Sequence, residues 1–365
     1  MPPIRDVPVK KVGILNSGGD CCGLNAVIAS AVKTGSNLGY EFVGFEKGWE
    51  GVLSPMMYRP LTRDDVRGIS YLGGTILGTV NKGRFGAKQG EGNERRIPDE
   101  ILLEAKHNLE KIGVDGLIVI GGDGTLSGAH QLAQMGVKII GVPKTIDNDL
   151  KATDRTFGFS TAAQVVVDAL DRIHTTASSH GRVILVETMG RHAGWIALRG
   201  GLAGGAHAIL LPEFDFRLED LVEYLRERQA GGKASVVVVA EGIKVLDKVV
   251  SSKMTAEQEV RLGGVSGHLM SQIELMAPNE FDMRNTILGH VQRGGTPNAA
   301  DRVIAKAYGS EAIKAFDQGK FGQVVVYSHL EMVLVPLDPV ANSVKHVTTN
   351  TMEYITARDM GIFVH

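Results

Sequence analysis

Cysteine is almost missing from this chain of 365 residues, which contains only Cys21 and Cys22. Two adjacent cysteines cannot link distant segments, so a fold held together by disulfides is excluded. The simplest interpretation is that both are small side chains packed at the start of a helix. The alternative is a pair of reactive thiols, because the N-terminus of a helix lowers the pKa of a cysteine.

Long hydrophobic runs and an excess of charge of one sign are also missing. The longest purely apolar strings, such as Val236 to Ala240, have about five residues, whereas a membrane helix needs about 20. The N-terminus carries charges and prolines where a signal peptide has an apolar core. The net charge is −2, and lysine and arginine form no dense block. We therefore expect a cytoplasmic protein that binds neither membranes nor nucleic acids.

Glycine, in contrast, is abundant, with 46 residues and no collagen-like period. Many turns must therefore bring the backbone close to a neighbouring group or a ligand. The chain is also longer than the roughly 250 to 300 residues that one hydrophobic core organises, which predicts two lobes.

Apolar strands alternate with amphipathic helices along the chain. We expect strands over residues 11–15, 41–45, 117–120, 138–142, 183–186, 208–211 and 236–240. We expect helices over residues 23–38, 98–112, 124–135, 161–176 and a stretch around 218–225. This order predicts an α/β fold of two lobes, each a mostly parallel sheet sandwiched by helices, with a boundary near Leu150.

Two further segments predict local structure, namely the start of one helix and a charged insertion. Thr161-Ala162-Ala163-Gln164 has the spacing of a capping box, which would start a helix at Thr161. The charged interval from Lys244 to Arg261 is typical of a solvated insertion that belongs to the scaffold.

Two glycine-rich turns follow strands and precede helices. In Ser17-Gly18-Gly19-Asp20 the N–H groups and the helix dipole would bind a phosphate, although a plain tight turn is the favoured interpretation of this segment taken alone. The second turn, Gly121-Gly122-Asp123-Gly124-Thr125, adds Asp123, whose carboxylate suits Mg²⁺. A similar turn occurs in NAD kinases and diacylglycerol kinases.

Thr145-Ile146-Asp147-Asn148-Asp149 places two carboxylates on the same side of an extended segment. A hydroxyl that attacks phosphorus must lose its proton, and a positioned carboxylate accepts it, so Asp147 is the candidate base. The alternative is an acidic turn that caps the next helix.

Several arginines and a histidine lie in glycine-rich segments at strand ends, where they suit a phosphomonoester dianion. A single arginine is more often part of a surface ion pair, but a group of them in such turns favours ligand binding. They are Arg182, Arg191 in Met189-Gly190-Arg191, and Arg284, His290 and Arg293 in R-N-T-I-L-G-H-V-Q-R-G-G.

The combination S-G-G-D, G-G-D-G-T, P-K-T-I-D-N-D, M-G-R and G-H-V-Q-R-G-G, in this order from Ser17 to Gly295, resembles the 6-phosphofructokinase family. The resemblance implies two α/β lobes with the active site in the cleft between them. It also implies transfer of a phosphoryl group from ATP to the C1 hydroxyl of fructose 6-phosphate, a glycolytic reaction, in an assembly that is usually a homotetramer. Residues 1–150 would then form the ATP and Mg²⁺ lobe and residues 151–295 the sugar-phosphate lobe. Residues 296–365 would return across both lobes.

The resemblance also implies roles for single residues. Gly18, Gly19 and the turn Gly121, Gly122, Asp123, Gly124 and Thr125 would bind the donor, with Asp123 holding Mg²⁺. Asp147 would take the proton, and Thr145 and Asp149 would position substrate and metal-bound water. The sugar phosphate would be bound by Met189, Gly190, Arg191, Glu241, His290 and Arg293. Arg182 and Arg284 match residues that a neighbouring subunit donates, so the active site would require a homodimer or homotetramer.

The sequence departs from the family pattern at three places. Lys144 before T-I-D-N-D is typical of pyrophosphate users, whereas Gly124 is typical of ATP users because a residue without Cβ leaves room for the α-phosphate. Where bacterial relatives present an arginine to the transferring phosphate, this chain has Asn81, and Lys82 or Arg84 would supply the charge. The first helix offers only Ala29 and Lys33 where the bacterial effector site has basic residues, which argues against the usual effectors.

The sequence therefore predicts an ATP-dependent 6-phosphofructokinase. A pyrophosphate-dependent enzyme with the same acceptor is the first alternative. A non-catalytic sugar-phosphate sensor is an alternative of another class, although it would not need Asp123, Thr145, Asp147 and Asp149 together. An NAD or lipid kinase does not explain the G-H-V-Q-R-G-G segment.

Overall fold

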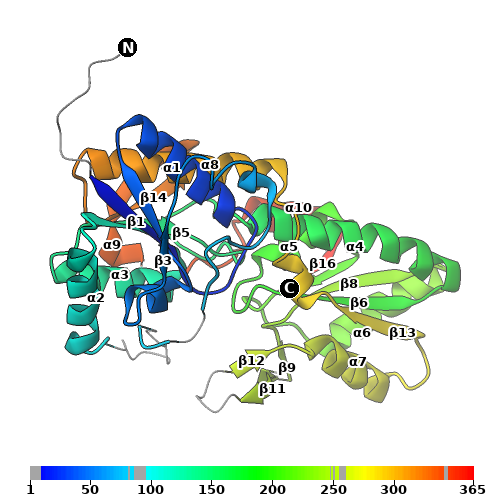
Figure 1. Cartoon of the computed structure of the whole chain (residues 1–365). Helices are drawn as coiled ribbons and strands as arrows, with labels where there is room; N and C mark the ends of the chain where they lie inside the picture. Colours follow the sequence, from blue (N-terminus) through cyan, green and yellow to red (C-terminus); the bar gives the residue numbers. More distant parts are fainter. Residues whose placement is uncertain are drawn as a thin grey trace. The chain divides into compact units, whose positions relative to one another are not determined.

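The computed structural model describes residues 10–80, 83–85, 96–246, 248–249, 251–254, 260–340 and 344–365 (Figure 1). The chain divides into two compact units. Unit 1 contains the residues up to 145 together with 150–158 and 293–344. Unit 2 contains residues 146–149, 159–292 and 345–365.

Unit 1 is built on a seven-stranded sheet in the order β15-β14-β5-β4-β1-β2-β3. The inner strands pair in parallel, and β3 and β15 pair antiparallel at the edges. The strands are β1 (Lys11–Asn16), β2 (Glu41–Phe45), β3 (Tyr58–Pro60), β4 (Gly116–Gly121), β5 (Ile139–Pro143), β14 (Gln323–Ser328) and β15 (Glu331–Pro336). Every residue of β4 is buried, as a strand covered on both faces requires.

Helices cover both faces of this sheet. Figure 1 shows α1 and α8 together on one face and α2 and α3 on the other. The α-helices are α1 (Leu24–Asn37), α2 (Asp99–Lys111), α3 (Asp123–Gln134), α8 (Ala299–Asp317) and α9 (Leu337–Val340), and the 3₁₀ segments are η1 (Gly48–Val52) and η2 (Ile69–Tyr71). Helices α1 and α8 approach so closely that a Cβ on Gly309 would collide with the carbonyl oxygen of Val27.

Unit 2 contains a five-stranded, entirely parallel sheet in the order β13-β6-β8-β7-β16. Its strands are β6 (Val183–Thr188), β7 (Ala208–Leu210), β8 (Ser235–Ala240), β13 (Met283–Ile287) and β16 (Phe363–Val364). Its helices are α4 (Phe159–His180), α5 (Trp195–Ala203), α6 (Leu218–Ala230), α7 (Val265–Met276) and α10 (Met352–Asp359), with the 3₁₀ segment η3 (Gly289–Gln292). In Figure 1, α4 and α5 lie on one face of the sheet, and α6 and α7 lie on the other.

The charged insertion of unit 2 forms two small antiparallel pairs. One joins β9 (Lys244–Val245) to β10 (Lys248–Val249), and the other joins β11 (Ser251–Met254) to β12 (Val260–Leu262).

The predicted alternation of strands and helices is confirmed, and the α/β fold with two parallel-sheet cores is the observed one. The predicted capping box is wrong, because α4 begins at Phe159 and Thr161 lies inside its first turn. Among the described residues, no helix is both long enough and apolar enough to span a membrane.

Candidate active site

In unit 1, the turn Ser17–Asp20, here called the donor turn after its predicted role, follows β1 and lies beside the end of β4. Strands β1 and β4 are parallel neighbours, and the N–H of Ser17 donates to the carbonyl of Ile120 at 3.0 Å. Gly18 has φ +82°, a conformation that glycine adopts without strain. The hydroxyl of Thr79 donates to the Gly18 carbonyl at 2.6 Å and holds the turn from its other side.

Lys144 and Thr125 lie at the same turn. The buried ammonium group of Lys144 donates to the carbonyl of Gly19. A Cβ placed on Gly18 would lie 3.5 Å from both Lys144 Nζ and Thr125 Oγ1. The structure therefore brings together, within unit 1, a glycine turn, a hydroxyl and an ammonium group, which is the chemistry that a phosphate requires.

Asp123 is the first residue of α3, with Gly122 as the N-cap residue. Anions are favoured at this end of a helix because its first N–H groups lack intrahelical partners. Gly121 is required here, because a Cβ would collide with the side chain of Thr125. No group of three His, Cys, Asp or Glu side chains that could hold a metal occurs among the described residues. A single partly exposed carboxylate fits Mg²⁺, which proteins bind through one or two carboxylates together with water and substrate phosphates.

In unit 2, Asp147 and Glu241 are both buried, with 5% and 9% of their surfaces exposed. The pKa of Glu241 is raised, mainly because the carboxyl group is buried, and the negative charge of Asp147 raises it further. Hydrogen bonds from the N–H groups of Arg191 and Gly190 act in the opposite direction and lower this pKa. Both acids are thus buried polar residues of the same unit.

The loop Met189–Arg191, here called the M-G-R loop, follows β6 and is held by Glu241. Oε1 of Glu241 accepts hydrogen bonds from the N–H groups of Arg191 at 3.0 Å and Gly190 at 3.3 Å. Arg191 adopts φ +53° and Gly190 φ +141°, so the loop keeps a backbone shape that its surroundings impose. Gly242 completes the packing, because a Cβ there would collide with the carbonyl oxygen of Arg191.

Arg182 and Arg284 lie together, but at the opposite end of the sheet from the M-G-R loop. Arg182 precedes β6, and Arg284 is the second residue of the adjacent parallel strand β13. Both guanidinium groups bind Asp282, at 2.7 Å and 2.6 Å. The hydrogen bond from Arg182 is the main cause of a lowered pKa at Asp282.

Other predicted residues have different surroundings. The guanidinium group of Arg293 lies beside the donor turn, with Nη1 donating to the Asp20 carbonyl at 3.2 Å. His290 is exposed in η3 of unit 2. Arg84 lies between Glu50 and Glu104, at 3.6 Å and 3.4 Å. Lys82 lies outside the described residues.

The two cysteines are packed side chains, as the simpler interpretation predicts. Both are buried, and Cys22 Sγ donates to the carbonyls of Gly294 and Gly295, each at 3.2 Å. Burial raises the pKa of both thiols, that of Cys22 to about 12. The alternative of reactive thiols with a lowered pKa is therefore wrong.

Sequence reasoning missed Glu187, which has 1% of its surface exposed. Its Oε1 accepts from the N–H of Gly264 at 2.7 Å, and its Oε2 accepts from the N–H and hydroxyl of Ser266 at 2.9 Å and 2.8 Å. Glu187 therefore caps the N-terminus of α7 from strand β6, two residues before the M-G-R loop. An acid inside the apolar strand V-I-L-V-E-T is the signal that would have revealed it.

Together these features define a class: two-unit α/β proteins that bind phosphorylated ligands through glycine turns and acidic residues at the carboxyl ends of parallel strands. Comparison with known proteins gives the family. The family model described as phosphofructokinase matches residues 11–316, and the chain belongs to this family of enzymes.

Curated relatives of two kinds match almost the whole chain. An ATP-dependent 6-phosphofructokinase of Chloroflexus aggregans is 45% identical over 97% of each chain. A pyrophosphate–fructose 6-phosphate 1-phosphotransferase of Streptomyces coelicolor is 46% identical over 97% of this chain and 99% of its own. Among solved structures, phosphofructokinase from Saccharomyces cerevisiae is 30% identical with a TM-score of 0.76. That match covers 91% of this chain, which spans only 45% of the yeast chain.

Proposed function

We propose that this protein transfers the γ-phosphoryl group of ATP to the C1 hydroxyl of fructose 6-phosphate and thereby makes fructose 1,6-bisphosphate in glycolysis. The observation that carries the proposal is the grouping of buried Asp147 and Glu241 with the M-G-R loop in unit 2. A base beside a loop that binds a sugar is what an alcohol acceptor requires. The similarity to curated fructose 6-phosphate kinases supports the same acceptor.

In this mechanism, Asp147 accepts the proton of the attacking hydroxyl, and Thr145 and Asp149 position the reacting groups. Glu241 fixes the backbone of the M-G-R loop through two N–H groups, so that Met189, Gly190 and Arg191 present a fixed surface to the sugar. His290 and Arg293 are assigned to the 6-phosphate of the sugar.

The residues of unit 1 are assigned to the donor. The N–H groups of Gly19 and the Gly121–Thr125 turn bind its phosphates, and Gly18, whose own N–H donates to the carbonyl of Val80, shapes the turn beside them. The ammonium group of Lys144 adds positive charge beside Gly19. Asp123 would hold Mg²⁺, whose charge offsets that of the donor phosphates. Lys82 and Arg84 are the candidates for a further cation at the transferred phosphoryl group.

ATP is the proposed donor because Gly124 lacks a Cβ beside Asp123, where an aspartate would crowd and repel an α-phosphate. Pyrophosphate is the second candidate, and a specific observation favours it: Lys144 places a buried ammonium group at the donor turn. Curated relatives of both kinds are equally similar to the chain.

The donor is tested by steady-state assays of the purified protein with fructose 6-phosphate and either ATP or pyrophosphate. We expect kcat/KM to be at least about 100-fold higher with ATP, and a higher value with pyrophosphate would reverse the assignment. Gly124→Asp is expected to shift the ratio toward pyrophosphate by excluding the α-phosphate. Gly231→Asp, at the exposed C-cap position of α6 where φ is −81°, is the control and is expected to leave the ratio unchanged.

We further propose that the active site is shared between subunits of a homodimer or homotetramer. Strand β6 separates Arg182 from the M-G-R loop by roughly 20 Å, given about 3.3 Å per strand residue. Arg182 and Arg284 therefore cannot reach the sugar bound at the M-G-R loop of their own chain. A neighbouring subunit is the proposed source of these two guanidinium groups.

A further inference from the structure

A cavity of about 430 Å³ lies in unit 2, and no step of the proposed reaction uses it. Its walls come from the loops that follow β6, β7 and β8, from Lys244 in β9, and from His346 and Val347 in the C-terminal segment. In an open parallel α/β sheet, ligands bind outside the carboxyl ends of the strands. The cavity is near the lower end of the size range of small-molecule sites, so it would hold a small metabolite.

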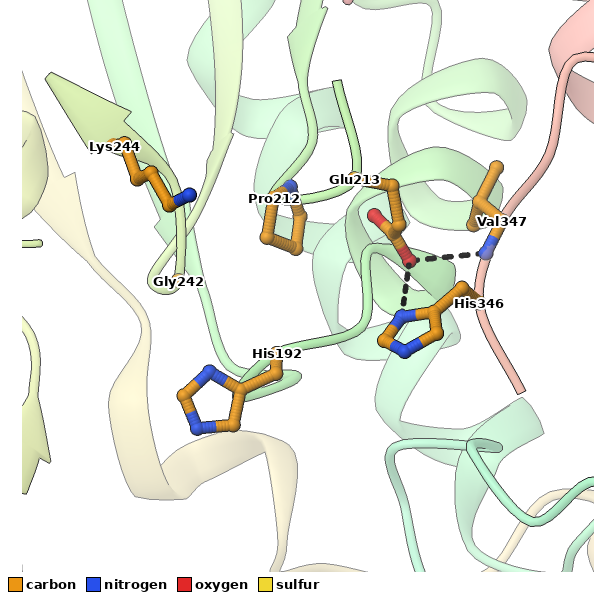
Figure 2. Close-up of a pocket in the computed structure, with 7 residues that line it drawn as sticks. All are labelled: His192, Pro212, Glu213, Gly242, Lys244, His346 and Val347. Atoms are coloured by element: carbon orange, nitrogen blue, oxygen red, sulfur yellow. Dashed lines mark hydrogen bonds and ion pairs between the residues drawn. The ribbon is translucent and has the colours of Figure 1, made fainter. Parts of the chain in front are cut away.

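Three nitrogen-bearing side chains surround the cavity. Figure 2 shows His192, Lys244 and His346 around Pro212 and Glu213, and all three are exposed to solvent. Lysine carries positive charge, and the imidazole ring of histidine donates hydrogen bonds. The accessible polar side chains of this cavity therefore suit an anion.

Glu213 is acidic, but its carboxylate is already engaged by the protein. Its side chain is only 5% exposed. Oε1 accepts from the N–H groups of Gly194 at 2.9 Å and Val347 at 3.0 Å, and Oε2 accepts from Gly194 at 3.1 Å. The Nδ1 atom of His346 lies 3.9 Å from Oε1 (Figure 2). Backbone donors thus compensate the charge of Glu213, and an anion in the cavity would not face a bare carboxylate.

We propose that this cavity is a binding site for a small anionic metabolite that carries a compact dianionic group, either a phosphoryl group or a polycarboxylate. Lys244 supplies positive charge, and the imidazole groups of His192 and His346 supply hydrogen-bond donors. Glu213 holds the loop at Gly194 and the C-terminal segment at Val347 in the positions that form the walls.

The site is also connected to the proposed catalytic residues. The N–H of Lys345 donates to the carbonyl of Asp149, and the indole N–H of Trp195 donates to the carbonyl of Lys345 at 2.8 Å. Segment 345–347 therefore touches both the cavity and the end of the T-I-D-N-D motif. An anion that binds His346 would bias the position of this segment, and occupancy of the cavity would change turnover. This regulatory consequence rests on the proposed function, whereas the binding site does not.

Binding is tested by isothermal titration of the full chain with inorganic phosphate and, separately, with citrate, which distinguish the two kinds of anion. The test variant is Lys244→Ala with His346→Gln. The control is His180→Gln with Lys320→Ala, which alters the same residue types at exposed positions elsewhere. We expect the test variant to bind one anion fewer per chain, or at least about tenfold more weakly at one site, than the wild type and the control. Neither variant changes His290, Arg293 or the donor turn, so any phosphate bound there is common to all three proteins.

Indistinguishable isotherms for the wild type, control and test variant would overturn the proposal. Thermal unfolding checks that the test variant is folded, and Lys244→Ala alone, at an exposed position, provides the comparison if the pair is destabilised. A chain that binds the anion but does not phosphorylate fructose 6-phosphate would refute the proposed function and leave the site intact. A chain that phosphorylates fructose 6-phosphate but binds no anion in this cavity would refute the binding site and leave the proposed function intact. The anion that binds is then added to the kinetic assay, where kcat or KM is expected to change in the wild type and not in the test variant.

Discussion

At the scale of single residues, three acidic side chains are buried in unit 2, although burying an apolar side chain would cost less free energy. Asp147, Glu187 and Glu241 are all at most 9% exposed. Burying a carboxyl group is unfavourable unless the protein supplies partners. Glu187 and Glu241 receive backbone N–H groups, and this is why they tolerate burial.

Asp147→Asn tests the proposed base. The amide keeps the size of the side chain but cannot accept the proton, so we expect kcat to fall by roughly 10² to 10⁴-fold while fructose 6-phosphate binding changes much less. Steady-state kinetics and calorimetry measure the two quantities. Asp171→Asn, at an exposed position on α4, is the matched control. Near-normal turnover of Asp147→Asn would reject the assignment.

Glu241→Gln tests the raised pKa of Glu241. A carboxyl group whose pKa is higher in the folded than in the unfolded state stabilises the fold at low pH. That contribution is lost as the pH rises from the ordinary value of 4.5 through the raised value. The amide does not titrate, and its carbonyl still accepts hydrogen bonds from the M-G-R loop. We therefore expect the free energy of unfolding of Glu241→Gln to increase relative to the wild type across this pH window. Urea denaturation at a series of pH values measures it, and a difference that is constant with pH would show that titration of Glu241 does not contribute to stability.

Residue types in motifs could be predicted from the sequence, but their partners could not. The glycine turns and T-I-D-N-D are local patterns, so Gly18, Asp123 and Asp147 were identifiable from the order of residues alone. Glu187 binds Gly264, which lies 77 positions further along the chain. Gly242 packs against Arg191, which lies 51 positions earlier. No local sequence pattern indicates such long-range pairs.

At the scale of elements, buried parallel strands were predictable because they are nearly continuous apolar runs. Strand β2 has the predicted bounds, and α2 agrees within a residue at each end. The start of α4 was not predictable, because its first turn contains Phe159, whose burial in the core outweighs the local capping signal at Thr161. Burial of a side chain in the core can therefore outweigh a local sequence pattern for the start of a helix.

Glu187→Gln tests the link between strand β6 and helix α7. The amide keeps one acceptor oxygen but turns an NH₂ group toward donors, so at least one N–H of Gly264 or Ser266 loses its partner. We expect the free energy of unfolding to fall by about 1 to 3 kcal/mol, measured by urea denaturation. Ser266→Ala removes only the hydroxyl of the same network and is expected to cost about 1 kcal/mol. A larger loss for Ser266→Ala than for Glu187→Gln would show that the carboxylate does not cap α7.

At the scale of the whole molecule, the sequence predicted two α/β units with a boundary near Leu150 and a segment 296–365 that returns across both, whereas the structure divides the chain in more places. Residues 150–158 and 293–344 belong to unit 1, and 146–149 and 345–365 belong to unit 2. Such assignments depend on long-range packing, which sequence periodicity does not record. The structure places Arg182 and Arg284 at the amino ends of β6 and β13, although none of the strands predicted from the sequence covers β13.

That placement gives a quantitative test of the shared active site. Asp147→Asn and Arg284→Ala are each expected to be inactive alone, because every site then lacks either its base or its donated arginine. In a mixed oligomer, a site is intact only when its own chain supplies Asp147 and its neighbour supplies Arg284. Random mixing of equal amounts satisfies both conditions at about one quarter of the sites, so mixing after mild dissociation is expected to restore about 25% of wild-type activity. If Arg284 served its own chain, no site in any hybrid would contain both residues, and the mixture would remain as inactive as its components.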